Sequence, residues 1–529
     1  MTAMEDQQKS IDRAIELHQA GRLPEALALY EEVFSQQGDW NATLLYLLGT
    51  AYYQTHKLPD AEKMLQRSVE LDFQNPGAHS NLGLVLETLG RLNEALDSFD
   101  AALSIKPDFS GAFSNKGSTL RQMGRLDEAL SSFEAAIKIR PDFVEAHYNR
   151  GLVLQDLDQL ESAIESYDKA IELNPDYAEA YCNRGNALRA LNCLDEALSS
   201  YNAALRLNPN YPEANWNKGY LLLLLGQFAE GWRLYEWRRR LNLFQNAFRP
   251  RGNPLLPDTK LEGDPTVFVY SEQGLGDTLQ FCRYVNELAQ KPVKVLFQVP
   301  KVLFPLMSAL DPKVSMVPSE EGYPPFDYQT SVMSLPWVLG TTLDSVPQQS
   351  PYLSASDDSR TRWHQALGLK TRPRVGLVWS GGSDHINDRN RSIPLALFTT
   401  LLDPAFEWHA IQCEYREGDQ ALLDLHPEII QHHEQLTHFD ETAALLEAMD
   451  LVISVDTAVA HLAGALGKPL WLLLPFVPDF RWLTHREDSP WYPTAGLYRQ
   501  KSPGGWASVL ERVKKDLMDR FKDQVLGEA

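Results

Sequence analysis

Residues 117–141 read GSTLRQMGRLDEALSSFEAAIKIRP, and this stretch returns with small changes along the first half of the 529-residue chain. Its glycine, two of its alanines, its aromatic ring and its proline each recur at intervals of 34 residues. The members are Gly49, Gly83, Gly117, Gly151, Gly185 and Gly219; Ala61, Ala95, Ala129, Ala163 and Ala197; Ala102, Ala136, Ala170 and Ala204; Phe99, Phe133, Tyr167, Tyr201 and Tyr235; and Pro107, Pro141, Pro175 and Pro209. Several residue classes that keep one phase over so many periods indicate a tandem array of like units.

The conserved spacing predicts two antiparallel helices in each period. Glycine and alanine suit the places where the two helices cross, because a larger side chain would hold the backbones apart, and the ring is expected to fill the gap between neighbouring repeats. Proline ends the second helix, since it lacks the N–H that an α-helix needs. Each helix pair can bury its apolar face only against its neighbours, so residues 1–240 are expected to form an α-solenoid with a concave groove.

An asparagine keeps the same period, two residues before the repeat glycine, at Asn81, Asn115, Asn149, Asn183 and Asn217. It falls on the first helix of each pair, which we expect to line the groove. A row of carboxamides can hold the backbone of an extended peptide without reading its sequence, because each amide both donates and accepts. These residues are candidate acceptor contacts. The alternative is that asparagine bonds locally at this position and binds no partner.

The pattern changes after residue 240. Residues 241–264 are rich in Pro, Gly and Asn and are expected to form a linker. The arginines around it are expected to end a helix and to pair with acidic neighbours, rather than to bind nucleic acid; they are Arg238, Arg239, Arg240, Arg249 and Arg251. From residue 265, short apolar runs alternate with helical stretches, which predicts two α/β halves with parallel sheets, 265–365 and 366–529. The runs are 266–270, 294–299, 375–379, 451–455 and 470–475.

Ligands of such folds bind at the carboxyl ends of the strands, so the loops that follow the runs are candidate sites. The first loop holds Gly274, Gly276 and Asp277, and the carboxylate could also be a simple helix cap. The second holds Ser380, Gly381 and Gly382, followed by Arg389 and Arg391; small donors followed by arginine suit a diphosphate.

The third loop begins with Asp456 and Thr457, either of which can cap a helix whose free N–H groups would face an anion. His461 lies deeper in that helix. It is a catalytic candidate, and the alternative is a buried structural histidine. Nothing near it has the spacing of a metal site.

Two parts of the chain resemble known families. Residues 7–240 are similar to tetratricopeptide repeats. Residues 265–520 resemble glycosyltransferase family nine, the heptosyltransferase-like group, through GLGD (274–277), NDRNRSIPL (387–395), DTAVAHLAGALGKP (456–469) and PFVPDFRWLTHREDSPWYPTA (475–495). The combination is similar in architecture to the O-linked N-acetylglucosamine transferases. The resemblance implies a GT-B fold of two Rossmann-like halves, the acceptor side first and the nucleotide-sugar side second.

The resemblance also implies residue roles. Asp277 corresponds to the proposed general base, and Arg391, with Arg389 as the other candidate, to a basic residue on the diphosphate. Gln412 and Glu414 are implied to meet the nucleoside. The candidate donor-binding set is Gly274, Gly276, Ser380, Gly381, Arg391, Gln412, Asp456, Thr457, Ala458, Val459 and His461.

These inferences predict a glycosyltransferase that moves a sugar from a nucleotide-diphosphate donor to an acceptor hydroxyl, on a protein or peptide held by the groove. Asp156–Asp158 is the only Asp-x-Asp and lies within the repeats, so we expect metal-independent inverting transfer with no cofactor beyond the nucleotide sugar. The alternatives are an interaction scaffold with an inactive domain, and a heptosyltransferase-like enzyme that acts on a glycan.

Composition limits the partners and the compartment. A formal net charge of −22 disfavours nucleic acid and anionic membranes as partners. No apolar run approaches the length of a membrane span. The four cysteines form no paired motif, which is typical of a reduced, cytoplasmic protein.

Overall fold

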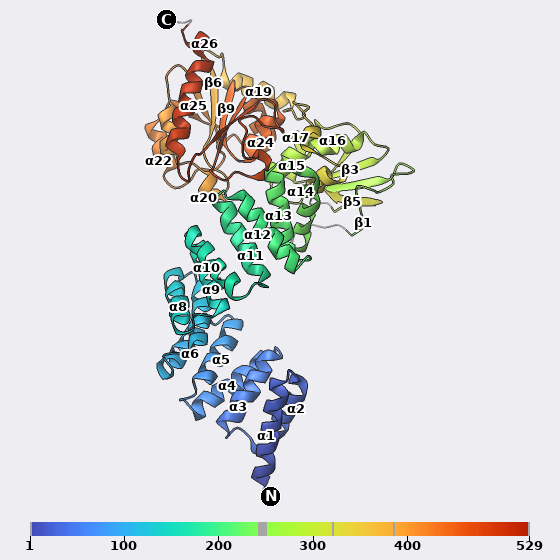
Figure 1. Ribbon diagram of the computed structural model, residues 1–529. Coiled ribbons are helices and arrows are strands. Elements are labelled where there is room, and N and C mark those ends of the chain that lie inside the picture. The colour runs from blue at the N-terminus through green and yellow to red at the C-terminus, as the bar shows by residue number, and fades with distance from the viewer. Residues whose placement is uncertain (1–2, 242–250, 320–321, 384–386, 527–529) are drawn as a thin grey trace. The chain divides into compact units, whose positions relative to one another are not determined.

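The computed structural model describes residues 3–241, 251–319, 322–383 and 387–526 (Figure 1). The chain divides into two compact units, Met1–Pro209 and Asn210–Ala529. Arg249, named above with the linker arginines, lies outside the described residues. Within the described ranges, no helix combines the length and the apolar character needed to cross a bilayer.

The first unit is built of helices that pair in sequence, α1 with α2 through α11 with α12. They are α1 (Ala3–Gln19), α2 (Leu23–Gln37), α3 (Ala42–Gln54), α4 (Leu58–Leu71), α5 (Pro76–Thr88), α6 (Leu92–Ile105), α7 (Ser110–Gln122), α8 (Leu126–Ile139), α9 (Val144–Asp156), α10 (Leu160–Leu173), α11 (Ala178–Ala190) and α12 (Leu194–Leu207). The prolines at 107, 141, 175 and 209 each stand just beyond the second helix of a pair, as the sequence predicts. The predicted α-solenoid is confirmed.

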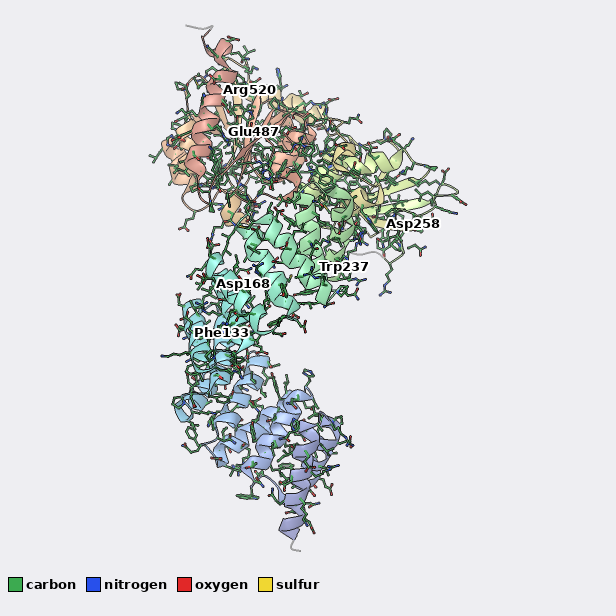
Figure 2. The ribbon with its side chains drawn as sticks, in the orientation of Figure 1. Phe133, Asp168, Trp237, Asp258, Glu487 and Arg520 are labelled. Carbon is green, nitrogen blue, oxygen red and sulfur yellow. The ribbon has the colours of Figure 1, made fainter. Side chains whose placement is uncertain are left out.

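The repeat glycine and the repeat ring meet inside one hairpin. A Cβ atom on Gly117 would lie 2.9 Å from the ring of Phe133, which is labelled in Figure 2. The same contact recurs at Gly83, Gly151 and Gly185. We expected the ring between neighbouring repeats, but glycine leaves room for it within its own hairpin.

The second unit begins with one more hairpin, α13 (Pro212–Leu224) and α14 (Phe228–Tyr235), followed by the 3-10 helix η1 (Glu236–Arg240). A parallel sheet of order β1-β5-β2-β3-β4 follows. Its strands are β1 (Asn253–Pro254), β2 (Thr266–Tyr270), β3 (Lys294–Val299), β4 (Val314–Pro318) and β5 (Tyr328–Ser331). Its helical elements are α15 (Leu275–Phe281), α16 (Arg283–Ala289), η3 (Lys301–Leu303), α17 (Phe304–Met307), η4 (Val332–Ser334), α18 (Leu335–Val338) and η5 (Leu343–Ser345).

A second parallel sheet has the order β11-β10-β9-β6-β7-β8. Its strands are β6 (Arg374–Val378), β7 (Glu407–Ala410), β8 (Ile429–Gln431), β9 (Leu451–Val455), β10 (Leu470–Leu474) and β11 (Ala495–Arg499). Its helical elements are α19 (Asp357–Leu367), α20 (Asp388–Arg391), α21 (Leu395–Phe398), η6 (Thr399–Leu401), α22 (Asp419–Leu425), α23 (Phe439–Glu447), α24 (Ala458–Ala465), η7 (Phe480–Trp482), α25 (Trp506–Arg520) and α26 (Lys522–Leu526). Strands β6, β9 and β10 are buried along their whole length, as the apolar runs predict. The α/β class of this half of the chain is confirmed.

Three boundaries differ from those expected. The hairpin 212–235 groups with the sheets, although the period assigns it to the solenoid. Residues 253–254, expected in the linker, pair with β5 as the edge strand β1. Helix α19, expected partly in the first half, packs on α23 of the second half, where Ser359 donates to Asp440.

Candidate functional site

The loops after β6 and β9 come together because these strands are neighbours in the second sheet. Arg391 joins them. Its Nη1 donates to the carbonyl oxygen of Asp456 at 2.9 Å. Its guanidinium also lies against Gly381, where a Cβ atom would be 2.4 Å from Nη2. The structure therefore gathers residues of two loops that the sequence named separately.

Helix α24 begins at this cluster, with Thr457 as its N-cap residue. The first backbone N–H groups of an α-helix have no partner within the helix, which favours an anion there. Among the described residues, neither the buried hydroxyl of Thr457 nor Nε of Arg391 has a hydrogen-bond partner. Unused donors and a cation at a helix start are suited to a phosphate group.

Gln412 supports the loop rather than a ligand. Its Oε1 accepts from the N–H groups of Trp379 (3.3 Å) and Ser380 (3.2 Å). Its Nε2 donates to the carbonyl and the hydroxyl of Ser380 and to the carbonyl of Glu414, at 3.0–3.1 Å. The residue is 5% exposed, so this amide has little left to offer a nucleoside. We assign Gln412 to the support of Ser380.

Asp277 lies in the first turn of α15, which packs against α24 of the other half. Its Oδ2 accepts from the backbone N–H of Gly274 at 2.8 Å, so the capping role considered from the sequence is present. Its Oδ1 pairs with Arg481 of η7. The carboxylate is thus more than a cap: it is held at both oxygens.

Arg481 and Asp479 are functional candidates that the sequence analysis missed. Arg481 donates to Oδ1 of Asp479 at 2.7 Å and to Oε1 of Gln280 at 2.5 Å. Burial alone would lower the pKa of Arg481, but the carboxylates of Asp479 and Asp277 raise it above its ordinary value. Both residues lie within the stretch 475–495, which contributes to the family resemblance. The resemblance itself implies no role for either residue.

Asp456 and His461 are adjacent and both perturbed. Burial, with the nearby Asp479 carboxylate, raises the pKa of Asp456 to about 6. Burial also lowers the pKa of His461 well below its usual range, and nearby arginines add to the effect. The Nδ1 of His461 lies 3.0 Å from the hydroxyl of Tyr492, and its ring stacks on Trp482. His461 is therefore a buried, neutral and hydrogen-bonded histidine, which favours the structural alternative.

The predicted groove residues differ among themselves. Asn81, Asn115, Asn149 and Asn183 are partly exposed. The amide of Asn81 donates to Thr50 and that of Asn183 to Tyr148. Asn217 is 7% exposed and lies on a hairpin that belongs to the second unit, which disfavours the acceptor contact predicted for it.

The Asp-x-Asp pair belongs to the repeats, as expected. Asp156 accepts from Arg121 at 2.6 Å, and Asp158 adopts a positive φ of 63° in the turn that follows α9. In the described part of the chain, no three His, Cys, Asp or Glu side chains cluster as metal ligands.

Comparison with known proteins finds matches in both parts of the chain. Tetratricopeptide-repeat models match residues 17–85, 76–109, 117–158, 156–192 and 185–226. A model described as Glycosyltransferase family 9 (heptosyltransferase) matches residues 436–473, which include β9 and α24. The chain thus carries tetratricopeptide repeats followed by a segment of the glycosyltransferase family 9 type.

Protein FlbA of Caulobacter vibrioides is 28% identical over 323 residues, 56% of this chain and 53% of FlbA. The chain therefore spans about half the length of this curated relative. Among solved structures, MamA is 24% identical, with a TM-score of 0.29 over 31% of this chain and 96% of MamA. YrrB, described as a TPR protein with an unusual peptide-binding site, is 20% identical, with a TM-score of 0.30 over 35% of this chain and 95% of YrrB.

Proposed function

We propose that the second unit is a glycosyltransferase that moves a sugar from a nucleoside-diphosphate donor to an acceptor hydroxyl. One observation carries the proposal: Arg391, lying on Gly381 and bonded to the carbonyl of Asp456, stands at the start of α24 with unused hydrogen-bond donors around it. The family 9 match over 436–473 supports the same assignment.

The proposed chemistry is direct displacement. The acceptor oxygen forms a bond to the anomeric carbon of the sugar while the bond from that carbon to the diphosphate oxygen breaks. The acceptor proton passes to the Asp277 carboxylate, a general-base role. Arg391 and the N–H groups of α24 stabilise the negative charge that develops on the leaving diphosphate. These groups provide both requirements of the step, so the proposal routes it through no metal, with inversion at the sugar carbon.

We further propose that the solenoid presents the acceptor, a protein segment held in its groove. Four successive repeats each carry a partly exposed asparagine, and these are Asn81, Asn115, Asn149 and Asn183. Each carboxamide can meet a peptide N–H and a peptide carbonyl, which suits a backbone of any sequence.

Release of nucleoside diphosphate from a panel of nucleotide sugars tests the activity in the full chain. We expect Asp277→Asn to lower kcat by about 100-fold or more with donor affinity little changed, the effect of losing a general base. Arg391→Met should raise the Kd for the nucleoside diphosphate by about 10-fold, because a charge-assisted contact is lost.

Two matched variants serve as controls. Asp488 is an exposed aspartate paired with Arg486, and Arg389 is the exposed arginine two residues before Arg391. Asp488→Asn should leave both constants unchanged. Arg389→Met separates the two arginine candidates: we expect the Kd to stay unchanged, and a rise in this variant but not in Arg391→Met would assign the diphosphate contact to Arg389. A wild-type chain that neither binds nor turns over any donor would favour the scaffold alternative. Transfer to a glycan but to no peptide would favour the heptosyltransferase-like one.

A further inference from the structure

The hairpin α13–α14 departs from the repeats that precede it. In the four preceding hairpins the glycine faces the ring sixteen residues later, as Gly185 faces Tyr201. The corresponding pair is Gly219 and Tyr235, but a Cβ atom on Gly219 would instead meet Cβ of Leu234 at 2.8 Å. The ring of Tyr235 packs on Phe480 at 5.7 Å between centroids. The last hairpin therefore directs its repeat ring toward η7.

From this arrangement we infer that α13–α14 is part of the catalytic machinery: through Tyr220 and Asp479 it holds Arg481, and Arg481 positions the Asp277 carboxylate. The inference rests on the proposed function, in which Asp277 receives the acceptor proton. Tyr220, Asp479 and Arg481 are positioning residues, because they act through Asp277.

The contacts form one continuous chain. The Tyr220 hydroxyl donates to Oδ2 of Asp479 at 3.2 Å. The other oxygen of Asp479 accepts from Nη1 and from the backbone N–H of Arg481, at 2.7 and 3.0 Å. Nη2 of Arg481 pairs with Asp277, whose second oxygen accepts from Gly274. Both carboxylates are thus fixed at both oxygens, which leaves Asp277 little freedom to rotate.

Aromatic rings form the seat of this arginine. Its guanidinium carbon lies 4.5 Å from the ring centroid of Phe480 and 5.4 Å from that of Phe281. The ring of Phe480 in turn packs against those of Tyr220 and the buried Trp232, with centroids 5.4 and 5.6 Å away. Helices α13 and α14 therefore supply the surface on which η7 rests.

The charges around Arg481 explain why its position affects Asp277. Arg481 is buried and shared between two acids, Asp277 and Asp479. A hydrogen bond from Tyr220 holds one oxygen of Asp479, so that the other oxygen stays in place against the guanidinium of Arg481. Loss of that bond lets Asp479 and Arg481 move, and the position of Asp277 changes with them. A base displaced by a fraction of an ångström loses turnover rather than donor affinity.

Tyr220→Phe in the full chain tests the inference, because it removes one hydroxyl and keeps the ring. We expect kcat to fall about 3- to 10-fold, the effect of one hydrogen bond to a charged group, with the donor KM unchanged. Hydrogen exchange of the Gly274 amide should rise, since its acceptor Asp277 is less well held. Tyr498→Phe is the matched control: it loses a 2.9 Å bond to Asp516 elsewhere in the same unit and should change neither readout.

Arg481→Ala adds a rescue experiment. Turnover should fall more than in Tyr220→Phe and return in part when guanidinium ion is added at millimolar concentration, because the ion replaces the lost group.

Tyr220→Phe with the wild-type kcat and wild-type exchange at Gly274 would overturn the inference while Asp277→Asn still upholds the proposed function. If the wild-type chain shows no turnover, the proposed function is wrong, and so is the claim that Tyr220 affects catalysis. The exchange comparison with Tyr498→Phe then shows separately whether Tyr220 positions Asp277.

Discussion

Gly276 faces the ring of His461 so closely that a Cβ atom would lie 3.0 Å from Cδ2 of the histidine. Gly276 belongs to α15 and His461 to α24, so this contact is where the two α/β halves touch beside Asp277. The ring is held by Tyr492 and Trp482, and the next nearest atom is the Cα of Ala458, at 3.3 Å.

Gly276→Ala should therefore destabilise the second unit. Neither the fixed ring nor the backbone of Ala458 can give way cheaply, and we expect a loss of about 1–3 kcal/mol in the free energy of unfolding, typical of overpacking. Urea denaturation measures it. Gly382→Ala is the control, because no heavy atom lies within 4 Å of its Cβ position. Equal stability of the two variants would contradict the close packing of α15 on α24.

Gly381→Ala should impair the donor site with little effect on stability. The added methyl group would lie 2.4 Å from Nη2 of Arg391, the flexible end of a side chain, which can move away. In moving it leaves the carbonyl of Asp456. We expect the Kd for nucleoside diphosphates, measured by calorimetry, to rise about as much as in Arg391→Met, roughly 10-fold. An unchanged Kd would mean that the position of Arg391 does not matter for binding.

Arg238→Met should be strongly destabilising. The side chain of Arg238 is 0% exposed and that of Glu272 is 1% exposed. Nε of Arg238 donates to Oε1 of Glu272 at 3.1 Å, and Nη2 donates to Oε2 at 2.8 Å. The variant leaves a buried carboxylate without its main partner, which costs about 3–5 kcal/mol. Arg486→Met, which breaks the pair between a partly exposed arginine and the exposed Asp488, should cost less than about 1 kcal/mol. Similar losses in the two variants, measured by denaturation, would contradict this account.

The free energy of unfolding should decrease as the pH is lowered, because of His409. Burial first, and then His432 and Arg374, lowers the pKa of His409 from 6.5 to about 3. Between these values the unfolded chain binds a proton that the folded chain does not. The contribution is therefore fully present above pH 6.5 and is lost as the pH falls toward 3, at about 1.4 kcal/mol per pH unit.

Unfolding free energies at pH 6 and pH 5 measure that slope. His409→Gln should lower the slope by the contribution of one proton, about 1.4 kcal/mol per pH unit, because the titrating group is gone. His364→Gln, at an exposed position on α19, should leave it unchanged. A slope in His409→Gln equal to that of the wild type would exclude His409 as the source.

Asn149→Ala combined with Asn183→Ala should weaken peptide acceptors. Each carboxamide is worth about one hydrogen bond, so KM for a peptide acceptor is expected to rise about 10-fold or more in the double variant. Asn217→Ala should not affect acceptor binding directly, since that side chain is buried. Unchanged acceptor kinetics in the double variant would leave the groove asparagines with a local role only.

Much of this architecture could be predicted from the sequence, because the evidence for it is local. A helix pair repeats every 34 residues, and its proline and glycine act on neighbours along the chain or on the partner helix. The apolar runs predicted parallel strands, and the topology rule then directed attention to the loops at 380 and 456. Those loops do meet, through Arg391 and Asp456.

The second part of the candidate site, around Asp277, could not be found in this way. Asp277 and Arg481 are 204 residues apart, and Tyr220 and Asp479 are 259 apart. No periodicity connects residues at such separations in a single sequence. The same limit applies to Asn217, which has the pattern of a groove residue but is buried in a hairpin that belongs to the second unit.

The sequence by itself determined the class of each part: a repeat solenoid, followed by two α/β halves with parallel sheets. These follow from burial periodicity and from residue conformation, which act over a few turns of chain. Only the tertiary structure decided which cation meets which carboxylate. Folding brings distant side chains into a water-poor interior, where a charge must find its counter-charge. At Asp277 that partner is Arg481, whose guanidinium lies over Phe480, a ring that packs on the last hairpin.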